Sequence, residues 1–231
     1  MTETLPELSL VIFDMDGTLV DSGSLILEVF ARTFATVGHP VPEPHEVLTL
    51  LGLSLPVLMA RLMPEADAAT LARAVAVHKA GFVALRQERG AAAAPLFAGA
   101  KAEIERLAAL PEVLIGAATG MARRGLDHVL EVHGFDRAFV TRQCADGHPS
   151  KPHPSMLEAA LAETGVAPGR AVMIGDTTYD MEMAANAGLA GIGVSWGHHG
   201  PADLLAAGAE IVVDDFAGLA RAIDSFREGR A

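Results

Sequence analysis

The fold of this chain is decided by one stretch, which reads Val11-Ile12-Phe13-Asp14-Met15-Asp16-Gly17-Thr18-Leu19-Val20-Asp21-Ser22. The apolar run that leads into it, Leu8 to Phe13, is short and rich in β-branched residues, which predicts a buried strand. Because alternate residues of extended backbone project to the same side, we expect Asp14 and Asp16 to point together. Two carboxylates that meet repel each other unless a proton or a cation lies between them. A strand that ends in an ordinary acidic turn gives the same local pattern, so the pair alone does not decide the function.

Composition limits the classes of protein. The chain has 231 residues, of which 51% are hydrophobic and 20% charged, enough for one large domain or a domain with a small partner. A formal net charge of −12 argues against a nucleic acid or an anionic membrane as partner. The single cysteine, Cys144, excludes an internal disulfide and fits a reducing compartment. No signal-peptide pattern opens the chain and no apolar run approaches the ~20 residues of a membrane span, so we expect a cytoplasmic protein.

The pattern of elements changes along the chain. From Pro95 onward, predicted strands and helices alternate, which is typical of a doubly wound (Rossmann-like) α/β core with a parallel sheet. Residues 22–94 show helical spacing only, and a crossover between parallel strands needs only about a dozen residues. We therefore predict an α/β core of residues 1–21 and 95–231 with an all-helical cap inserted at residues 22–94. A helical addition docked permanently on the core would have the same sequence pattern.

Polar side chains follow the ends of several predicted strands. Asp14 and Asp16 follow the first strand, Thr119 follows the second, and Asp176 follows the strand that ends at Ile174. In open parallel sheets, ligands bind beyond the carboxyl ends of the strands, near the point where the strand order reverses. We therefore expect these side chains to meet at one edge of the sheet.

These residue types suit phosphoryl transfer, whose transition state spreads negative charge over the transferring oxygens. Thr119 can donate a hydroxyl hydrogen bond, and Gly120 with the helix start behind it offers backbone amides to an anion. Lys151 can place a positive charge beside a phosphate. Asp176 can bind a hard cation such as Mg²⁺, and Asp180, four residues on, is expected on the same helix face.

In this order the motifs resemble the signature of the haloacid dehalogenase-like hydrolase superfamily, in particular its phosphoglycolate phosphatase-like group, which carries a helical cap. The resemblance extends from Leu8 to about Trp196. Residues 14–22 fit the first motif, and Thr119 fits the second. Ser150-Lys151-Pro152 fits the third motif and residues 175–180 fit the fourth.

This resemblance implies an enzyme, a Mg²⁺-dependent phosphatase that hydrolyses a small-molecule phosphate monoester through a phosphoaspartyl intermediate. Asp14 would attack phosphorus, and Asp16 would protonate the leaving alcohol and then activate water. The implied metal ligands are Asp14, Asp16 through its backbone carbonyl, Asp176 and Asp180, and the implied phosphate-binding residues are Thr119, Gly120 and Lys151. The expected partner is therefore a phosphorylated small molecule, handled by a monomer or a homodimer.

Two alternatives stay open. Sugar phosphomutases of the β-phosphoglucomutase type share Asp16, but they carry a histidine where this chain has Ile26 and an arginine clamp where it has Leu55. Their fourth motif has Glu-Asp in place of Gly175-Asp176. A non-enzymatic phospho-acceptor signalling protein also gathers Asp, Thr and Lys at strand ends, but it would be about half as long and would lack the helical insertion. Hydrolysis is the favoured interpretation.

The histidines are interpreted as structural. His78 falls on the apolar stripe of a predicted helix and is expected to pack there. His148, His153, His198 and His199 match no common zinc spacing, so we expect solvated loop residues.

Overall fold

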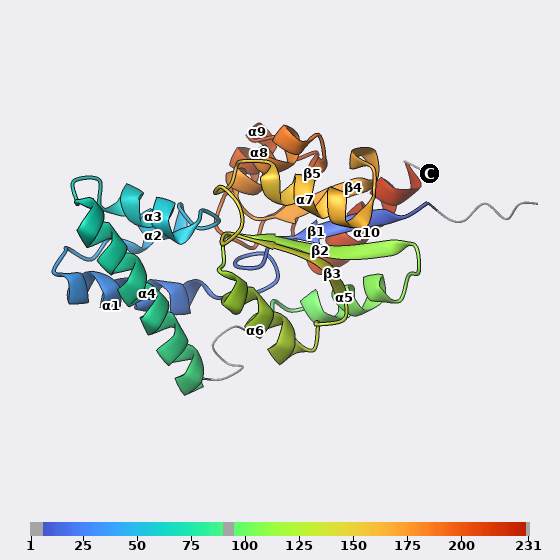
Figure 1. The fold of residues 1–231 in the computed structure, drawn as a ribbon. Coiled ribbons are helices and arrows are strands. Elements are labelled where there is room, and N and C mark those ends of the chain that lie inside the picture. The colour runs from blue at the N-terminus through green and yellow to red at the C-terminus, as the bar shows by residue number, and fades with distance from the viewer. Residues whose placement is uncertain (1–6, 90–94, 230–231) are drawn as a thin grey trace, which may run out of the picture.

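The computed structural model describes residues 7–89 and 95–229. At its centre is a six-stranded sheet in the order β3-β2-β1-β4-β5-β6, in which every neighbouring pair is parallel (Figure 1). The strands are β1 (Ser9–Phe13), β2 (Val113–Thr119), β3 (Phe139–Cys144), β4 (Ala171–Gly175), β5 (Ala190–Val194) and β6 (Ile211–Val213). The chain steps outward from β1 to β3 and then returns to place β4 on the other side of β1.

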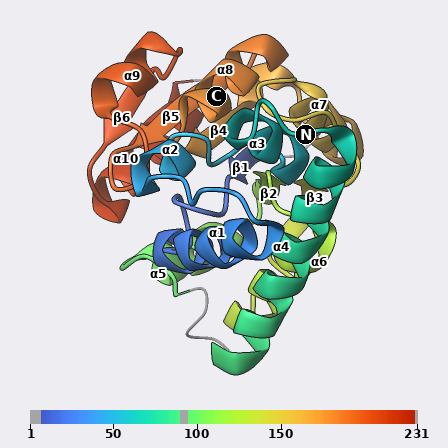
Figure 2. The same cartoon turned by 90° about the vertical axis from the view of Figure 1, so that its left-hand side faces the viewer.

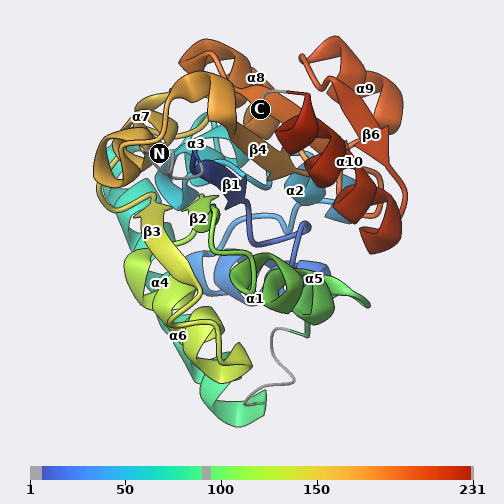
Figure 3. The ribbon, with the colours of Figure 1, turned by 90° about the vertical axis from the view of Figure 1, so that its right-hand side faces the viewer.

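Helices cover both faces of this sheet. The core helices are α5 (Ala100–Ala108), α6 (Arg123–His133), α7 (Ser155–Thr164), α8 (Thr178–Ala187), α9 (Pro201–Ala206) and α10 (Phe216–Glu228), with a 3₁₀ helix at Pro168–Arg170. Figure 3 shows α7 and α8 on one side of the sheet and α5 and α6 on the other. The predicted doubly wound α/β fold is therefore confirmed.

The alternation of β1 explains this layering. All five of its residues are buried. Val11 and Phe13 pack into the cluster that α5, α6 and α10 complete, whereas Leu10 and Ile12 pack against α7 and α8. A strand buried on both faces is mainly apolar, which is why Leu10 to Phe13 form a continuous apolar run instead of an alternating pattern.

Residues 23–89 contribute helices, and their described part contains no strand: α1 (Gly23–Val37), α2 (Pro44–Leu48), α3 (Leu55–Leu62) and α4 (Ala68–Arg89). We call these four helices and the loops between them the helical segment. Its own apolar cluster includes Phe30, Phe34 and Met59. Figure 2 views the molecule from the end where the helical segment stands in front of the sheet, beyond the carboxyl ends of the strands. It therefore lies over the edge where the predicted site residues gather.

Two elements differ from the sequence expectation. The apolar pattern predicts a short strand near Ala138 to Val140, but β3 continues to Cys144, and its polar residues Thr141 and Gln143 are buried. The sequence also predicts a helix from Met181 to Ala187, but α8 begins at Thr178, because the Thr177 side chain caps it by accepting from the Asp180 amide.

One helix among the described residues, α4, is long and apolar enough to cross a membrane by length and composition alone. The expectation that no run approaches that length is therefore wrong for Ala68–Arg89, whose many alanines give the helix an apolar average. The most apolar window is 17% buried inside the structure. Within the fold, α4 packs on α1 and α3, with Ala74, His78 and Leu85 buried.

Candidate active site

The site lies where the strand order reverses, at the carboxyl ends of β1, β4 and β2. The Asp14 amide donates to the carbonyl oxygen of Ile174 at 2.9 Å, so the first motif and the β4 exit are held side by side. Asp176 follows β4 directly and Thr119 is the last residue of β2. The three residues are each no more than 1% exposed. These residues therefore lie together at one edge of the sheet, as the sequence predicts.

Lys151 is a fully buried cation between two carboxylates. Its Nζ atom lies 2.9 Å from Asp14 Oδ1 and 2.6 Å from Asp180 Oδ1. Burial raises the pKa of the Asp14 carboxyl to about 7, against the lowering effect of Lys151, and the charges of Asp180 and Asp176 add to the rise. Burial alone lowers the pKa of Lys151, but the two carboxylates outweigh it and raise that pKa. Lys151 therefore stays charged.

Three buried carboxylates converge at this lysine. Asp14, Asp176 and Asp180 each offer an oxygen, and these oxygens all lie within 4.8 Å of one another. One lysine cannot neutralise three carboxylates, and oxygen atoms are the ligands that hard divalent cations prefer. The residues present therefore fit a divalent cation, and this cluster can bind a metal ion.

Asp180 makes contacts beyond the metal-ligand role that the sequence predicts for it. Its Oδ1 accepts from Lys151, and its Oδ2 accepts from the Thr177 amide at 3.1 Å and the Thr177 hydroxyl at 2.7 Å. Asp180 therefore holds the lysine in place, and its carboxylate also belongs to the cluster of three that can hold a metal ion. Gly175 leaves room for it, because a Cβ there would lie 2.3 Å from Asp180 Cγ.

Asp16 is placed differently from Asp14. It is half-buried, accepts a hydrogen bond from the Ser22 hydroxyl, and lines the same cavity as Asp14, whereas Met15 is buried in the core. The two acidic side chains thus face one space, as the alternation of extended backbone predicts.

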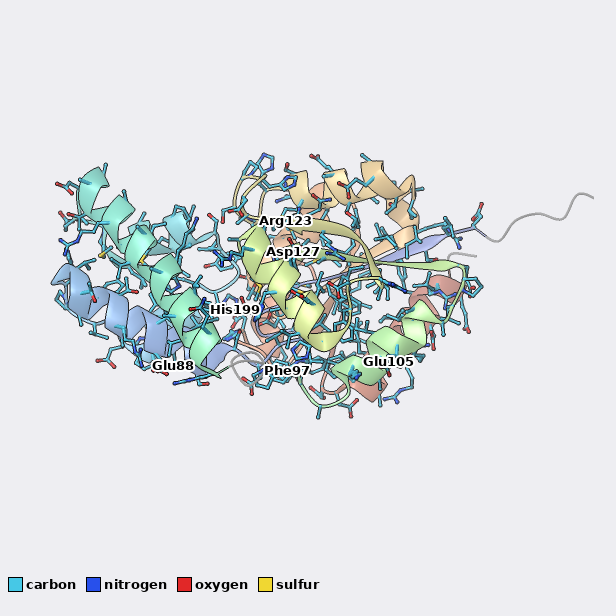
Figure 4. The ribbon with its side chains drawn as sticks, turned by 60° about the horizontal axis from the view of Figure 1, so that its bottom comes forward. Glu88, Phe97, Glu105, Arg123, Asp127 and His199 are labelled. Atoms are coloured by element: carbon cyan, nitrogen blue, oxygen red, sulfur yellow. The ribbon has the colours of Figure 1, made fainter. Side chains whose placement is uncertain are left out.

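This cavity has a volume of about 610 Å³ and lies between the helical segment and the core. Asp14, Asp16, Thr119 and Gly120 form its core end. Helices α4 and α6 line its sides, and Figure 4, in which Arg123 and Asp127 mark α6, shows the two helices next to each other. The predicted phosphate-binding residues Thr119 and Gly120 therefore share one cavity with the predicted catalytic carboxylates.

The loop before α3 closes this cavity against the core. The Ser54 amide donates to the Ser150 hydroxyl at 2.8 Å, next to Lys151. The Tyr179 hydroxyl donates to the Thr49 carbonyl at 3.2 Å. At Gly120 an added Cβ would lie 2.7 Å from the Gly52 carbonyl oxygen, so the loop rests directly on the backbone of the second motif. The helical segment is therefore in a closed position.

One site residue was interpreted wrongly from the sequence. His198 is not solvated: its side chain is 10% exposed, and its Nδ1 lies 2.6 Å from Asp176 Oδ2. Burial lowers the pKa of His198, but the hydrogen bond and charge of Asp176 outweigh it and raise that pKa. Thr18 completes the setting, since its hydroxyl donates to Asp176 Oδ1 at 2.8 Å. Thr18 lies in the quoted first motif, whereas nothing local to the sequence of the His198 loop indicates its partner.

Comparison with known proteins agrees with this geometry. Residues 11–194 match the family model of the haloacid dehalogenase-like hydrolases. The chain is 34% identical over 215 residues to the "Probable phosphatase IndB" of Dickeya dadantii, covering 90% of each, and 28% identical to the phosphoglycolate phosphatase of Photobacterium profundum, covering 90% of this chain and 93% of that one. The crystal structure of a predicted phosphatase from Clostridium acetobutylicum superposes with a TM-score of 0.83 at 22% identity, covering 95% of this chain and all of that chain. The chain belongs to the haloacid dehalogenase-like hydrolase family and is an enzyme of that family.

Replacing Lys151 tests its neutralising role. We expect Lys151→Met to lower the free energy of unfolding by about 3–5 kcal/mol in metal-free protein, because it leaves buried carboxylates unpaired. The measurement is urea denaturation at about pH 8, above the raised pKa of Asp14. The matched control is Lys101→Met, which removes an exposed ion pair of 3.8 Å and should cost no more than about 1 kcal/mol. Equal losses in the two variants would contradict the role.

Replacing Gly120 tests the closed contact. We expect Gly120→Ala to push the Gly52 loop away, because its Cβ would overlap a backbone carbonyl. Amide hydrogen exchange at Ser54 should then accelerate about 10-fold or more, as its bond to Ser150 opens. Gly147→Ala is the control, since a Cβ there meets nothing within 4 Å. If the exchange rate of the Ser54 amide were unchanged in the Gly120 variant, the contact between Gly120 and the Gly52 loop would not be needed to hold the loop in place.

Proposed function

We propose that this enzyme is a Mg²⁺-dependent phosphatase that hydrolyses a small-molecule phosphate monoester through a phosphoaspartyl intermediate. The observation that carries the proposal is the buried Asp14, which is paired with Lys151 beside Asp176 and lines the cavity under the helical segment. The phosphatase names of the two relatives support the same reaction class. In this proposal Asp14 is the nucleophile.

The family resemblance implies two steps, and the placement of Asp14 and Asp16 at one cavity is compatible with both. In the first, an Asp14 oxygen forms a bond to phosphorus as the bond to the substrate oxygen breaks, and Asp16 gives its proton to that leaving oxygen. In the second, Asp16 takes a proton from water as the water oxygen attacks phosphorus, which releases Asp14 and inorganic phosphate. Asp16 suits the proton transfers because it faces the cavity, where the leaving group must lie.

The remaining residues bind and balance charge. Mg²⁺ would be held by Asp14, the backbone carbonyl of Asp16 and Asp176, and when bound it neutralises charge on the transferring group and lowers the pKa of nearby acids. Asp180 would support this set, both by holding Lys151 and as the third carboxylate of the cluster. Thr119, Gly120 and Lys151 would hold the transferring phosphoryl oxygens.

The helical segment has a role in this proposal. Residues 22–94 would form a cap that opens to admit substrate and closes to exclude water, over a core of residues 1–21 and 95–231. The closed contacts of Gly52 and Ser54 on the core support this role. The boundary at residue 94 and the start of the core at residues 1–6 lie outside the described residues.

The cavity favours hydrolysis over phosphomutase chemistry. Ile26 and Leu55, which stand where the mutases carry a histidine and an arginine clamp, both line the cavity. Two apolar side chains at those positions cannot grip a second phosphate. A bisphosphate intermediate would therefore lack a second anchor there, whereas a monoester needs only the anchor at Asp14.

Metal dependence is the first test. We expect phosphate release from p-nitrophenyl phosphate to fall to background after treatment with excess EDTA, and to return when Mg²⁺ is added, because three buried carboxylates otherwise repel the incoming anion. The measurement is steady-state turnover. Full activity in the chelated protein would refute the metal requirement, and a single stoichiometric release without turnover would favour the phospho-acceptor alternative.

Asp14→Asn tests the nucleophile. We expect at least about a 10³-fold loss of kcat, since the amide oxygen is a poor nucleophile, with the cap still closed. Asp136→Asn is the control, because this exposed residue precedes β3 at the opposite edge of the sheet. If Asp14→Asn retained near-normal turnover, the assigned nucleophile would be wrong.

Asp16→Asn tests the proton transfer. General acid catalysis matters most for leaving groups that are strongly basic, and typically contributes about 10²–10⁴-fold. The variant should therefore lose far more kcat/KM with an alkyl phosphate than with p-nitrophenyl phosphate, whose phenolate leaves unaided. The comparison uses the ratio of the two substrates in wild type and variant. An equal loss of kcat/KM with both substrates would show that Asp16 positions the substrate and does not transfer the proton.

A further inference from the structure

The cap-side wall of the cavity is apolar. Ile26, Phe30, Leu58 and Phe82, from α1, α3 and α4, line it together with Val83. Leu53 and Leu55, from the loop and the start of α3, continue the wall toward the second motif. A polar leaving group that entered here would lose water contacts without gaining partners from these side chains. The wall therefore favours an apolar organic group.

The size of the cavity points in the same direction. Its volume of about 610 Å³ falls within the ~300–1,000 Å³ range of pockets that hold drug-sized ligands. A phosphate with a two-carbon leaving group, such as phosphoglycolate, would leave most of this space unfilled. Burial of apolar area is the main source of binding free energy in such pockets, so a small leaving group would gain little binding free energy from the apolar wall.

The charges of the cavity also disfavour a small leaving group that carries a negative charge of its own. Of the described residues that line it, the lysine and arginine side chains are Lys79 and Arg124, and both are exposed. They therefore stand at the solvent edge instead of inside. The carboxylate of phosphoglycolate would be enclosed near Asp14 and Asp16 with no buried cation assigned to it, which is a costly arrangement.

His78 is the exception in the apolar wall. Of the described residues that the helical segment contributes to the cavity, it is the one buried polar side chain, 6% exposed. Its ring packs against Phe30 with centroids 4.4 Å apart, and burial lowers its pKa to about 4, so it is neutral. Its Nδ1 atom is buried and has no hydrogen-bond partner among the described residues. Nδ1 is shielded from the cavity as well, so a ligand can meet His78 only through the part of the ring that lines the cavity, where a hydrogen bond to the ring would add affinity.

We propose that the substrate is a phosphate monoester with a bulky, mainly apolar leaving group of aromatic-ring size, carrying a hydrogen-bonding group that His78 recognises. This inference rests on the proposed phosphatase function and narrows its substrate class. It separates the chain from a phosphatase specialised for phosphoglycolate. The core end of the cavity would hold the phosphate while the apolar wall holds the ring.

The first experiment compares substrates whose leaving alcohols are similarly basic: ethyl phosphate, 2-phenylethyl phosphate and 2-(1-naphthyl)ethyl phosphate, with phosphoglycolate alongside. We expect kcat/KM with the naphthyl compound to exceed that with ethyl phosphate and phosphoglycolate by about 10-fold or more. Equal values, or a preference for phosphoglycolate, would overturn the inference. Turnover of p-nitrophenyl phosphate with Mg²⁺ would in that case still support the phosphatase itself, so the two failures are distinguishable.

The second experiment narrows the cavity. Val83→Trp places a large ring on the half-buried wall, and Ala84→Trp places the same ring on the exposed neighbouring position of α4 as its control. The ratio of kcat/KM for 2-(1-naphthyl)ethyl phosphate to that for ethyl phosphate should fall about 10-fold in the Val83 variant and stay unchanged in the control. An unchanged ratio in both variants would place the leaving group elsewhere.

The third experiment tests His78 with the hydroxyl isomers of 2-phenylethyl phosphate. At least one isomer should be preferred over the unsubstituted compound by about 3- to 10-fold in kcat/KM. His78→Phe, which keeps a ring against Phe30, should abolish that preference, and His78→Gln should retain part of it. A loss confined to stability, with every substrate ratio unchanged in both variants, would show that His78 is only a packing residue.

Discussion

The structure depends on the buried ion pairs of Lys151 with Asp14 and Asp180. Bringing carboxylates out of water is costly unless opposite charge accompanies them, and Lys151 supplies that charge at 2.9 Å and 2.6 Å. Asp14 nevertheless keeps a raised pKa, chiefly because it is buried and further because the charges of Asp180 and Asp176 oppose its ionisation. The site therefore carries more negative than positive charge. This excess favours binding of a metal ion, and the bound metal ion would in turn favour binding of a phosphoryl anion.

The α/β fold produces this crowding through its topology. β1 lies between β2 and β4, so the residues that end these strands come to one edge although they are far apart in sequence. Small residues then allow close approach: Gly175 admits the Asp180 carboxylate, and Gly120 admits the Gly52 loop. The helical segment adds a wall of different character, and the cavity between the two parts joins a charged end to an apolar end.

The sequence predicted what depends on local pattern. Three features could be predicted because each is visible within a short stretch of sequence. They are the apolar run of β1, the polar residues at strand ends and the helical spacing of residues 22–89. The sequence did not predict the burial of His198 on Asp176 or the polar length of β3, because both depend on contacts between distant segments. The sequence also did not predict that one side of α4 lines the cavity, because a histidine such as His78 on an apolar stripe indicates only packing.

The central claim is that Asp14 accepts phosphorus covalently. Rapid quenching during turnover, followed by borohydride reduction and peptide mass spectrometry, converts an aspartyl phosphate to homoserine at the modified position. The account predicts homoserine at position 14, absent without substrate and absent in Asp14→Asn. Modification at another residue, or none while turnover proceeds, would contradict it.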